Sequence, residues 1–321
     1  MRTLIIPCSN TAILDGTHRL LARHPDGKSL CMHCILDFDV SLFDRIIISI
    51  SEKDDRSFDI ANHLYLEAKQ YGVSLEICKI SEETFGPADA VYKTCAKMNV
   101  SGSIVIKDSH TSSKFVFPTT DNFIVGLNVF KCANDINNLK SKSFIVTNEN
   151  NLVLDIIEKS LKSDTIGVGV YGIEDVMDFY TAFSALNKSE YEFDKIYMSH
   201  IISYLIGAKK ANFYLVDAIA FDSFATQYEW NLFKNRCSSY FVNASILFDS
   251  NGHLITKSLE QIRRSIENGA EILLYSSSES SLKTCSKILK EHGVEITNSI
   301  CLKNNSKKVV IDSEVELNEL A

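Results

Sequence analysis

Residues 103–108 read SIVIKD, an apolar run that ends in an acidic residue, and this stretch decides the fold class. A run with almost no polar interruption is typical of a strand that is buried on both faces of a parallel sheet. Runs of the same kind lie at Thr3–Ile6, Arg45–Ile50 and Ser74–Ile80. We therefore predict that these segments form one parallel sheet, with ligands bound at the carboxyl ends of its strands.

Helical patterns separate these strands at Phe58–Tyr71 and Asp89–Met98. Alternating strands and helices predict an α/β fold with helices on both faces of the sheet. After Asp108 the pattern changes, and we expect longer, half-exposed strands of an antiparallel insertion at Asn122–Phe130, Ser143–Val146 and Thr165–Tyr171. Further helices are predicted at Ile173–Leu186, Phe193–Leu205 and Thr226–Phe233, and a short strand at Phe213–Val216.

A second, smaller unit is predicted at residues 236–321, after a first unit of residues 1–235. Its expected strands are Tyr240–Phe248, Glu271–Tyr275, Glu295–Cys301 and Lys308–Asp312, and its helices are Leu259–Asn268 and Ser281–His292. This alternation predicts a small parallel sheet of its own. Because no linker rich in Gly, Pro or Ser separates the units, we expect them to be packed together.

Composition excludes several classes of function. The chain has 321 residues and a net charge of -8, which argues against a nucleic-acid partner because no basic excess is present. No segment is apolar enough to span a membrane and no signal peptide is recognisable, so we expect a cytoplasmic protein. The nine cysteines are irregularly spaced, which indicates reduced thiols. Cys31 and Cys34 form a lone CxxC, and structural thiols are favoured over zinc there.

A series of landmarks occurs in order in the first unit. They are the strand Leu4–Pro7, the segments Gly16–Leu20 (GTHRL) and Gly27–Leu30 (GKSL), the turn Gly86–Ala90 (GPADA), the strand that ends at Asp108, the strand Thr165–Gly172 (TIGVGVYG) with the following Asp178-Phe179, and the segment Tyr197–His200 (YMSH). Their order resembles that of the sugar-phosphate nucleotidyltransferases encoded with bacterial capsule and surface-polysaccharide genes. The resemblance implies a Rossmann-like mixed sheet.

This resemblance implies transfer of a nucleotidyl group from a nucleoside triphosphate to a sugar or polyol phosphate, with Mg²⁺ as the cofactor. Arg19 and Lys28 would be the catalytic cations that contact phosphate. Asp108 and His200 stand where the family has its two metal-binding aspartates. The residues expected to contact the nucleotide are Gly16, Gly86, Pro87, Ala88 and Asp89.

Each of these assignments has a structural alternative. Arg19 and Lys28 could be solvated loop cations, and Gly86–Asp89 could be an ordinary helix start. Asp108 could cap a turn, and the nitrogen of His200 is a poor ligand for Mg²⁺. An alternative function is therefore a pseudoenzyme that binds nucleotide as a scaffold or regulator. An open phosphate cradle between Cys8 and Gly16 favours the enzyme, whereas a loop filled by the side chains of Asn10–Leu14 favours the pseudoenzyme.

The second unit resembles a haloacid-dehalogenase-type (HAD-like) phosphatase in the order of its elements. Asn243 and Ser245 stand where such phosphatases carry two aspartates, Ser276 ends the next strand, and Asp312 ends the last. An asparagine amide cannot replace the nucleophilic carboxylate, and serine cannot replace the acid–base group. We therefore predict an uncapped, inactive domain that serves packing or oligomerisation, which leaves a homo-oligomer open.

Overall fold

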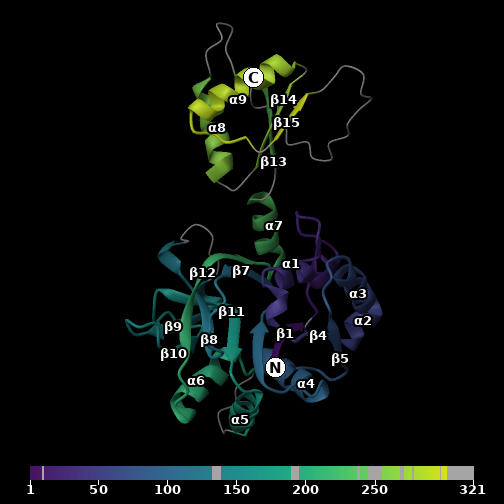
Figure 1. Ribbon diagram of the computed structural model, residues 1–321, viewed down its shortest axis with the longest axis vertical. Helices are drawn as coiled ribbons and strands as arrows, with labels where there is room; N and C mark the ends of the chain where they lie inside the picture. Colours follow the sequence, from purple (N-terminus) through teal and green to yellow (C-terminus); the bar gives the residue numbers. More distant parts are fainter. Residues whose placement is uncertain are drawn as a thin grey trace. The chain divides into compact units, whose positions relative to one another are not determined.

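The computed structural model describes residues 1–8, 11–131, 139–188, 195–236, 239–244, 247, 255–267, 271–276, 278–296 and 298–301. The chain divides into two compact units, Met1–Trp230 and Asn231–Ala321 (Figure 1). The boundary lies in helix α7 (Gln227–Arg236), as does the boundary predicted after residue 235. Among the described residues, no helix is long and apolar enough to cross a membrane.

Unit 1 is built on a 10-stranded mixed sheet, whose main path runs β5-β4-β1-β6-β11-β8-β12-β7. Its first four strands along this path are parallel, as the sequence predicts. They are β5 (Glu76–Ile80), β4 (Arg45–Ser51), β1 (Arg2–Cys8) and β6 (Ser103–Lys107). The α/β fold class and the mixed sheet are therefore confirmed for this unit.

The later strands extend the same sheet. β11 (Thr165–Ile173) is antiparallel to both β6 and β8 (Phe123–Asn128). β12 (Tyr214–Ser223) is parallel to β8 and antiparallel to β7 (Thr111–Phe115). β9 (Ser143–Thr147) and β10 (Val153–Glu158) form an antiparallel pair that joins the sheet through β11. The expectation of half-exposed strands is wrong for β11, which is buried along its whole length, and for β8, which is buried except at Asn128, because both lie inside the sheet.

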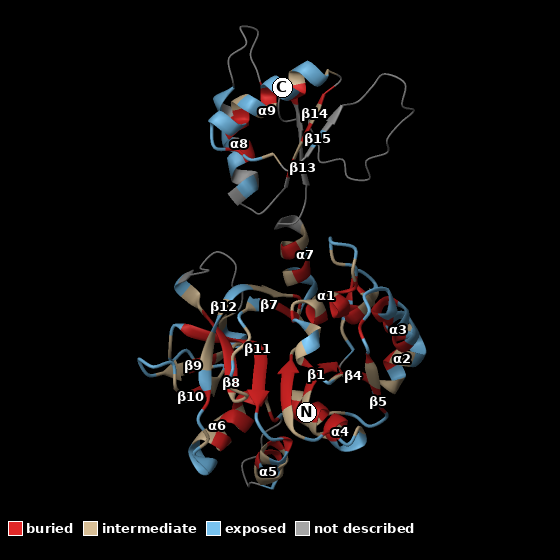
Figure 2. Ribbon diagram, in the orientation of Figure 1, coloured by how far each residue is buried: buried red, intermediate tan, exposed pale blue. Residues whose placement is uncertain are grey.

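Side-chain alternation divides the core between the two faces of the sheet. Leu4 and Ile6 of β1 pack with α1 (Leu30–Leu36) and α3 (Ile60–Gln70). Ile5 points the other way and packs with a second group of helices, which are α4 (Pro87–Lys97), α5 (Val176–Asn187) and α6 (Met198–Lys209). Figure 2 shows the buried central strands between these helices.

Short elements connect the strands at their carboxyl ends. After β1 the chain forms a hairpin of β2 (Ile13–Leu14) and β3 (Thr17–His18), which leads to the 3₁₀ helix Arg19–Leu21. After β4 it forms α2 (Glu52–Phe58), where only Asp54 is buried. Because α2 has almost no apolar face, its sequence carries no periodic signal. Other 3₁₀ turns lie at Val40–Leu42, Val129–Lys131 and Leu139–Ser141.

Unit 2 contains a three-stranded parallel sheet in the order β13-β14-β15. Its elements are β13 (Ser239–Asn243), α8 (Thr256–Glu267), β14 (Glu271–Ser276), α9 (Glu279–Glu291) and β15 (Asn298–Cys301). Leu274 at the centre of the sheet packs with Ile262 of α8 and Leu289 of α9. The strand predicted at Lys308–Asp312 lies outside the described residues.

Candidate functional site

Asp108 follows the last residue of β6, at the carboxyl end of the parallel strands. Its backbone N–H donates to the carbonyl of Gly169, 2.8 Å away. Gly169 has a φ of +81°, and a side chain there would collide with the carboxyl group of Asp108. The glycine in β11 therefore lets the Asp108 side chain lie directly against the sheet.

Charged groups surround the carboxyl group of Asp108. Burial raises its pKa to about 6, and the negative charge of Glu158 adds to this effect. The cations Lys107, Lys142 and Arg19 act in the opposite direction. The Nζ of Lys107 is buried and donates hydrogen bonds to the carbonyl and hydroxyl oxygens of Thr111. The raised pKa means that these cations do not offset the full cost of burying the carboxylate.

Glu158 ends β10 and is a second carboxylate of the same region, which is not among the predicted site residues. Its Oε2 accepts hydrogen bonds from the hydroxyl of Ser143, at 2.7 Å, and from that of Ser199, at 2.6 Å. A signal was present, because residues 153–158 read VLDIIE, a mostly apolar run that ends in an acid as SIVIKD does. Asp155 is polar and interrupts this apolar run, so the run does not show the continuous pattern of a buried strand.

Arg19 is brought to the same region by the 3₁₀ helix after the hairpin. The side chain is buried, and its Nη2 donates to the hydroxyl of Ser109 at 3.4 Å. Its Nε makes no hydrogen bond within the described part of the chain. Burial lowers the pKa of His110, and the charge of Arg19 lowers it further. Arg19 thus lies beside the residue that follows Asp108, and its charge and that of Glu158 both act on Asp108. Arg19 and Asp108 are predicted site residues.

Residues 13–18 form a hairpin in the segment on which the choice between an open phosphate cradle and a filled loop depends. Gly16 forms its turn with a φ of +78° and has open space where a Cβ would lie. The N–H of Asp15 donates to Oε1 of Gln227 at 2.9 Å, and that of Arg19 donates to the carbonyl of Ala12 at 2.7 Å. The carboxylate of Asp15 also accepts from Nε1 of Trp230 at 2.6 Å.

These contacts mean that the backbone N–H groups of Asp15 and Arg19 already have partners inside the chain. Ser9 and Asn10 lie outside the described residues, so these contacts test the predicted phosphate cradle only from Thr11 onwards. Leu14 is buried, whereas 43% of Ile13 is exposed. Gln227 and Trp230 therefore hold the hairpin in place through Asp15. A phosphate bound there would contact side chains and those backbone N–H groups that have no partner in the chain.

The segment Gly86–Asp89 begins α4. Gly86 has a φ of +149°, and a Cβ there would lie 2.9 Å from the carbonyl oxygen of Ile196. The N–H of Ala88 donates to the same carbonyl at 3.3 Å. The carboxylate of Asp89 accepts from the N–H of Phe85 and pairs with Lys93, both at 3.0 Å. Packing and capping therefore account for these residues, and their contact with a nucleotide stays a prediction.

His200 lies in the first turn of α6 and contributes to its cap. Its Nδ1 accepts from the N–H of Tyr197 at 3.3 Å. Burial lowers the pKa of His200, and the charge of Glu158 opposes this effect. His200 therefore belongs to the surroundings of Glu158, and its role as a metal ligand stays a prediction.

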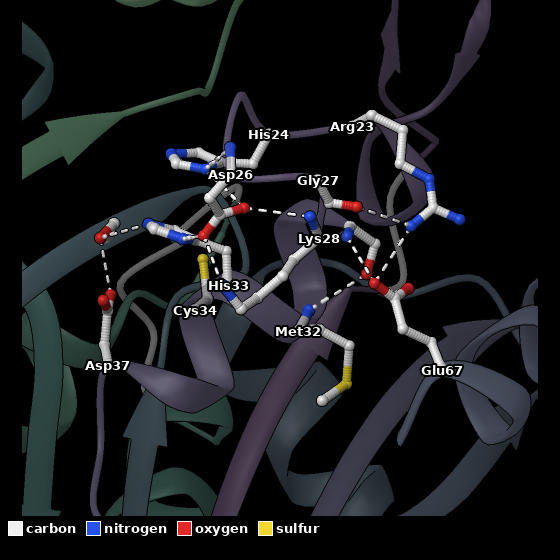
Figure 3. Close-up of polar contacts among 12 residues, drawn as sticks. Arg23, His24, Asp26, Gly27, Lys28, Met32, His33, Cys34, Asp37 and Glu67 are labelled. Atoms are coloured by element: carbon white, nitrogen blue, oxygen red, sulfur yellow. Dashed lines mark hydrogen bonds and ion pairs between the residues drawn. The ribbon is translucent and has the colours of Figure 1, made fainter. Parts of the chain in front are cut away.

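Lys28 lies on the loop of residues 23–29, where Figure 3 shows it among polar neighbours. Its Nζ pairs with Oδ2 of Asp26 at 2.8 Å and lies over the ring of Tyr71. Asp26 is in turn contacted by His24 and His33. This ion pair is partly exposed, so a ligand of higher charge could displace Lys28 from it.

In unit 2, Asn243 and Ser276 end neighbouring parallel strands. Asn243 of β13 stands opposite Tyr275 of β14, and Ser276 is the next residue. The hydroxyl of Ser276 accepts from the N–H of Ser278 at 3.2 Å. Two of the predicted site residues thus lie at one edge of the sheet, while Ser245 and Asp312 lie outside the described residues.

Comparison with known proteins supports the fold of unit 1. No protein-family model and no curated protein matches the sequence. Among solved structures, a nucleoside-diphosphate-sugar pyrophosphorylase from Vibrio cholerae covers 72% of this chain and 98% of its own, with a TM-score of 0.60 and 21% identity. An inositol-1-phosphate CTP transferase from T. maritima covers 73% and 94%, with a TM-score of 0.57 and 13% identity.

A third neighbour is a CTP:phosphocholine cytidylyltransferase from Streptococcus pneumoniae, which covers 72% of this chain and 96% of its own at a TM-score of 0.51 and 16% identity. The chain therefore spans nearly the whole length of these neighbours. At such low identity the likeness shows the fold, which is that of nucleotidyltransferases, and leaves the chemistry to the residues of this chain.

Proposed function

We propose that unit 1 transfers a nucleotidyl group from a nucleoside triphosphate to the phosphate of a sugar or polyol and releases pyrophosphate. The observation that carries this proposal is Asp108 at the carboxyl end of β6, with Arg19 bonded to the neighbouring Ser109 and with Glu158 near enough for its charge to act on Asp108. In open α/β sheets this edge is where ligands bind. The likeness of the fold to that of nucleotidyltransferases supports the same function.

The reaction asks the protein for charge stabilisation more than for acid–base chemistry. An oxygen of the acceptor phosphate attacks the α-phosphorus, the new P–O bond forms, and the bond to the bridging oxygen of the β-phosphate breaks as pyrophosphate leaves. Cations near the α-phosphate stabilise the charge that develops on its oxygens. Arg19 is suited to contact it, because its Nε has no protein partner within the described residues. Lys107 acts from deeper in the core through its charge.

Asp108 and Glu158 fit a Mg²⁺ ion. Both offer carboxylate oxygens, the ligand type that Mg²⁺ prefers. The pKa of Asp108, raised to about 6, marks a carboxylate whose charge the surrounding cations do not fully offset. We assign Glu158 as the second ligand in place of His200, because Nδ1 of His200 is engaged in the cap of α6. When bound, the ion would offset phosphate charge in the transition state.

Nucleotide binding without turnover is the second candidate, and the hairpin of residues 13–18 favours it. The donors of Asp15 and Arg19 are bonded within the chain, so they do not serve a triphosphate as the amides of a glycine loop do. In this case the protein acts as a nucleotide-binding scaffold or regulator. In either case we assign it to surface-polysaccharide synthesis, following the motif order described above.

A pyrophosphate-release assay distinguishes the two candidates. The full chain is incubated with Mg²⁺, each common nucleoside triphosphate and a panel of sugar and polyol phosphates. We expect turnover that falls at least about 100-fold in Asp108→Ala and Glu158→Gln, the order of loss seen when one transition-state contact is removed. Glu149→Gln, an exposed carboxylate outside the site, is the matched control.

Specific nucleotide binding without pyrophosphate release favours the second candidate. Thermal-shift measurements detect it, because a ligand that binds only the native state raises apparent stability. Turnover that survives both carboxylate substitutions excludes our assignment of the site.

For unit 2 we propose a HAD-like domain without phosphatase activity, because the end of β13 carries Asn243 in place of a nucleophilic carboxylate. No phosphate release from a panel of phosphomonoesters is expected. Phosphatase activity that disappears in Asn243→Ala contradicts this proposal.

A further inference from the structure

The loop of residues 23–29 holds three metal-ligating side chains close together. It is closed by a β-bridge between Arg23 and Ser29, and the N–H of His24 donates to the carbonyl of Lys28 at 2.8 Å. Gly27 turns the loop with a φ of +88°. This tight turn sets the side chains of His24 and Asp26 next to His33, which projects from α1 (Figure 3).

The two imidazole rings are stacked, with centroids 3.6 Å apart. Nδ1 of His24 lies 2.8 Å from Oδ1 of Asp26, and Nδ1 of His33 lies 3.0 Å from Oδ2. One ligand atom from each residue lies within 4.8 Å of the others. Ligand atoms at about 2.0–2.2 Å from a tetrahedral zinc ion lie roughly 3.5 Å from one another, so small rotations suffice.

The contacts within this cluster conflict with one another. Nδ1 of His24 faces the N–H of Asp26 at 3.1 Å and also Oδ1 of Asp26 at 2.8 Å. An imidazole nitrogen carries either a proton or a lone pair, so it can satisfy only one of these contacts. A bound metal would take up the lone pair of this nitrogen and would so resolve the conflict.

The environment of His33 resembles the outer shell of a metal site. Its Nε2 lies 3.3 Å from the hydroxyl of Ser112, which donates to Oδ2 of Asp37 at 2.6 Å. Metal-binding histidines commonly use their second nitrogen in such a contact, which fixes the ring. The side chains of His24, Asp26 and His33 are 11%, 30% and 20% exposed, so an ion can reach them from solvent.

We infer that His24, Asp26 and His33 form a binding site for a divalent transition metal of the zinc type, with water completing the coordination. Two imidazoles and one carboxylate suit Zn²⁺ or Co²⁺ better than Mg²⁺. The site is separate from the carboxylates Asp108 and Glu158. Because Nζ of Lys28 pairs with Asp26, the metal and Lys28 compete for one carboxylate.

The test is a Zn²⁺ titration of the full chain against a chromophoric chelator, with Co²⁺ as the spectroscopic probe. We expect one ion per chain and a Co²⁺ spectrum without thiolate charge-transfer bands. His24→Ala and His33→Ala should each weaken binding by more than the roughly 10–100-fold cost of losing an outer-shell contact. His63→Ala, an exposed histidine on α3, is the matched control and should have no effect.

Lys28→Met gives a second, opposite prediction. Removing the competing ammonium should tighten Zn²⁺ binding about twofold to fivefold, the equivalent of one exposed ion pair. Circular dichroism of each variant checks that it folds. Unchanged Zn²⁺ affinity in a His24→Ala, His33→Ala double variant overturns the proposal, and so do thiolate bands in the Co²⁺ spectrum. An Asp26→Asn variant that keeps Zn²⁺ affinity and binds inorganic phosphate more tightly would identify an anion site instead, which also overturns it.

Discussion

Replacing Gly169 by alanine should both destabilise unit 1 and displace the carboxyl group of Asp108. The residue has a φ of +81°, where an L-residue is strained by about 1–2 kcal/mol. An added Cβ would also lie 2.8 Å from the Cβ of Asp108 and collide with its carboxyl group. Overpacking of this kind costs about 1–3 kcal/mol. The sum predicts a loss of roughly 2–5 kcal/mol in the free energy of unfolding.

Gly16 provides a control that isolates the backbone term. Its φ of +78° is nearly the same, but a Cβ there meets nothing within 4 Å. Gly16→Ala should therefore cost only the roughly 1–2 kcal/mol of backbone strain. The difference between the two variants measures the steric push on Asp108 alone.

Urea unfolding followed by far-UV circular dichroism measures this difference, and the fluorescence of Trp230 in unit 1 offers a second probe. If Asp108 holds a functional ion, Gly169→Ala should also reduce pyrophosphate release. Gly16→Ala should lower stability but leave the contribution of Asp108 to pyrophosphate release unchanged. Equal unfolding midpoints for the two variants would refute the steric argument. They would mean that Asp108 moves aside at no cost.

Three further predictions concern polar side chains that bond or titrate inside unit 1. Because the folded-state pKa of Asp108 is about 6, above the ordinary 3.8, the native state binds this proton more tightly than the unfolded state, and stability falls as pH rises through that interval. In metal-free buffer, Asp108→Asn should therefore stabilise the protein by about 1–3 kcal/mol at pH 7.5, and the gain should vanish near pH 4, as thermal melts at both pH values can check. Glu67→Ala should lower the free energy of unfolding in urea by about 1–3 kcal/mol. It removes the acceptor of the buried N–H of Ser29, which is bonded to Glu67 at 2.7 Å. Glu67→Gln should cost less. Asp15→Ala removes the acceptor of the Nε1–H of Trp230, so the fluorescence maximum of this single tryptophan should shift and stability should fall by about 1.5–3 kcal/mol.

The apolar strands could be predicted from the sequence because burial on both faces leaves a continuous signal. Ser103–Lys107 has the predicted bounds, and the parallel order of the first four strands follows from the alternation with helices. The strand β10 could not be predicted in the same way. Asp155 interrupts its apolar run, and in the folded chain it accepts a hydrogen bond from the hydroxyl of Ser203 on α6. Tertiary contacts, which the local pattern does not contain, make this polar residue acceptable in the strand.

The residues of the candidate site also differ in whether the sequence could predict them. Asp108 could be found because strand ends of a parallel sheet have a fixed place in the fold. The apolar run before Glu158 indicates a strand end, but its place near Asp108 could not be predicted, because that place depends on β10 pairing through β9 with the rest of the sheet. The role of Lys28 could not be predicted either. Its partner Asp26 is contacted by residues 24 and 33 only when the loop folds back on α1.

Asp108 and the hairpin of residues 13–18, the two parts of the proposed phosphate site, lead to different expectations about function. A buried carboxylate lowers stability unless cations compensate it, and the raised pKa of Asp108 indicates incomplete compensation. Such groups gather at functional sites, which favours an enzyme over a scaffold. By contrast, the backbone N–H groups of Asp15, in the hairpin of residues 13–18, and of Arg19, just after it, are already bonded within the chain. A triphosphate would then be bound chiefly by Arg19 and a divalent ion, that is, by full charges. Because salt screens interactions between charges, nucleotide affinity should fall as ionic strength rises, and the burial of Arg19 should limit the size of this effect.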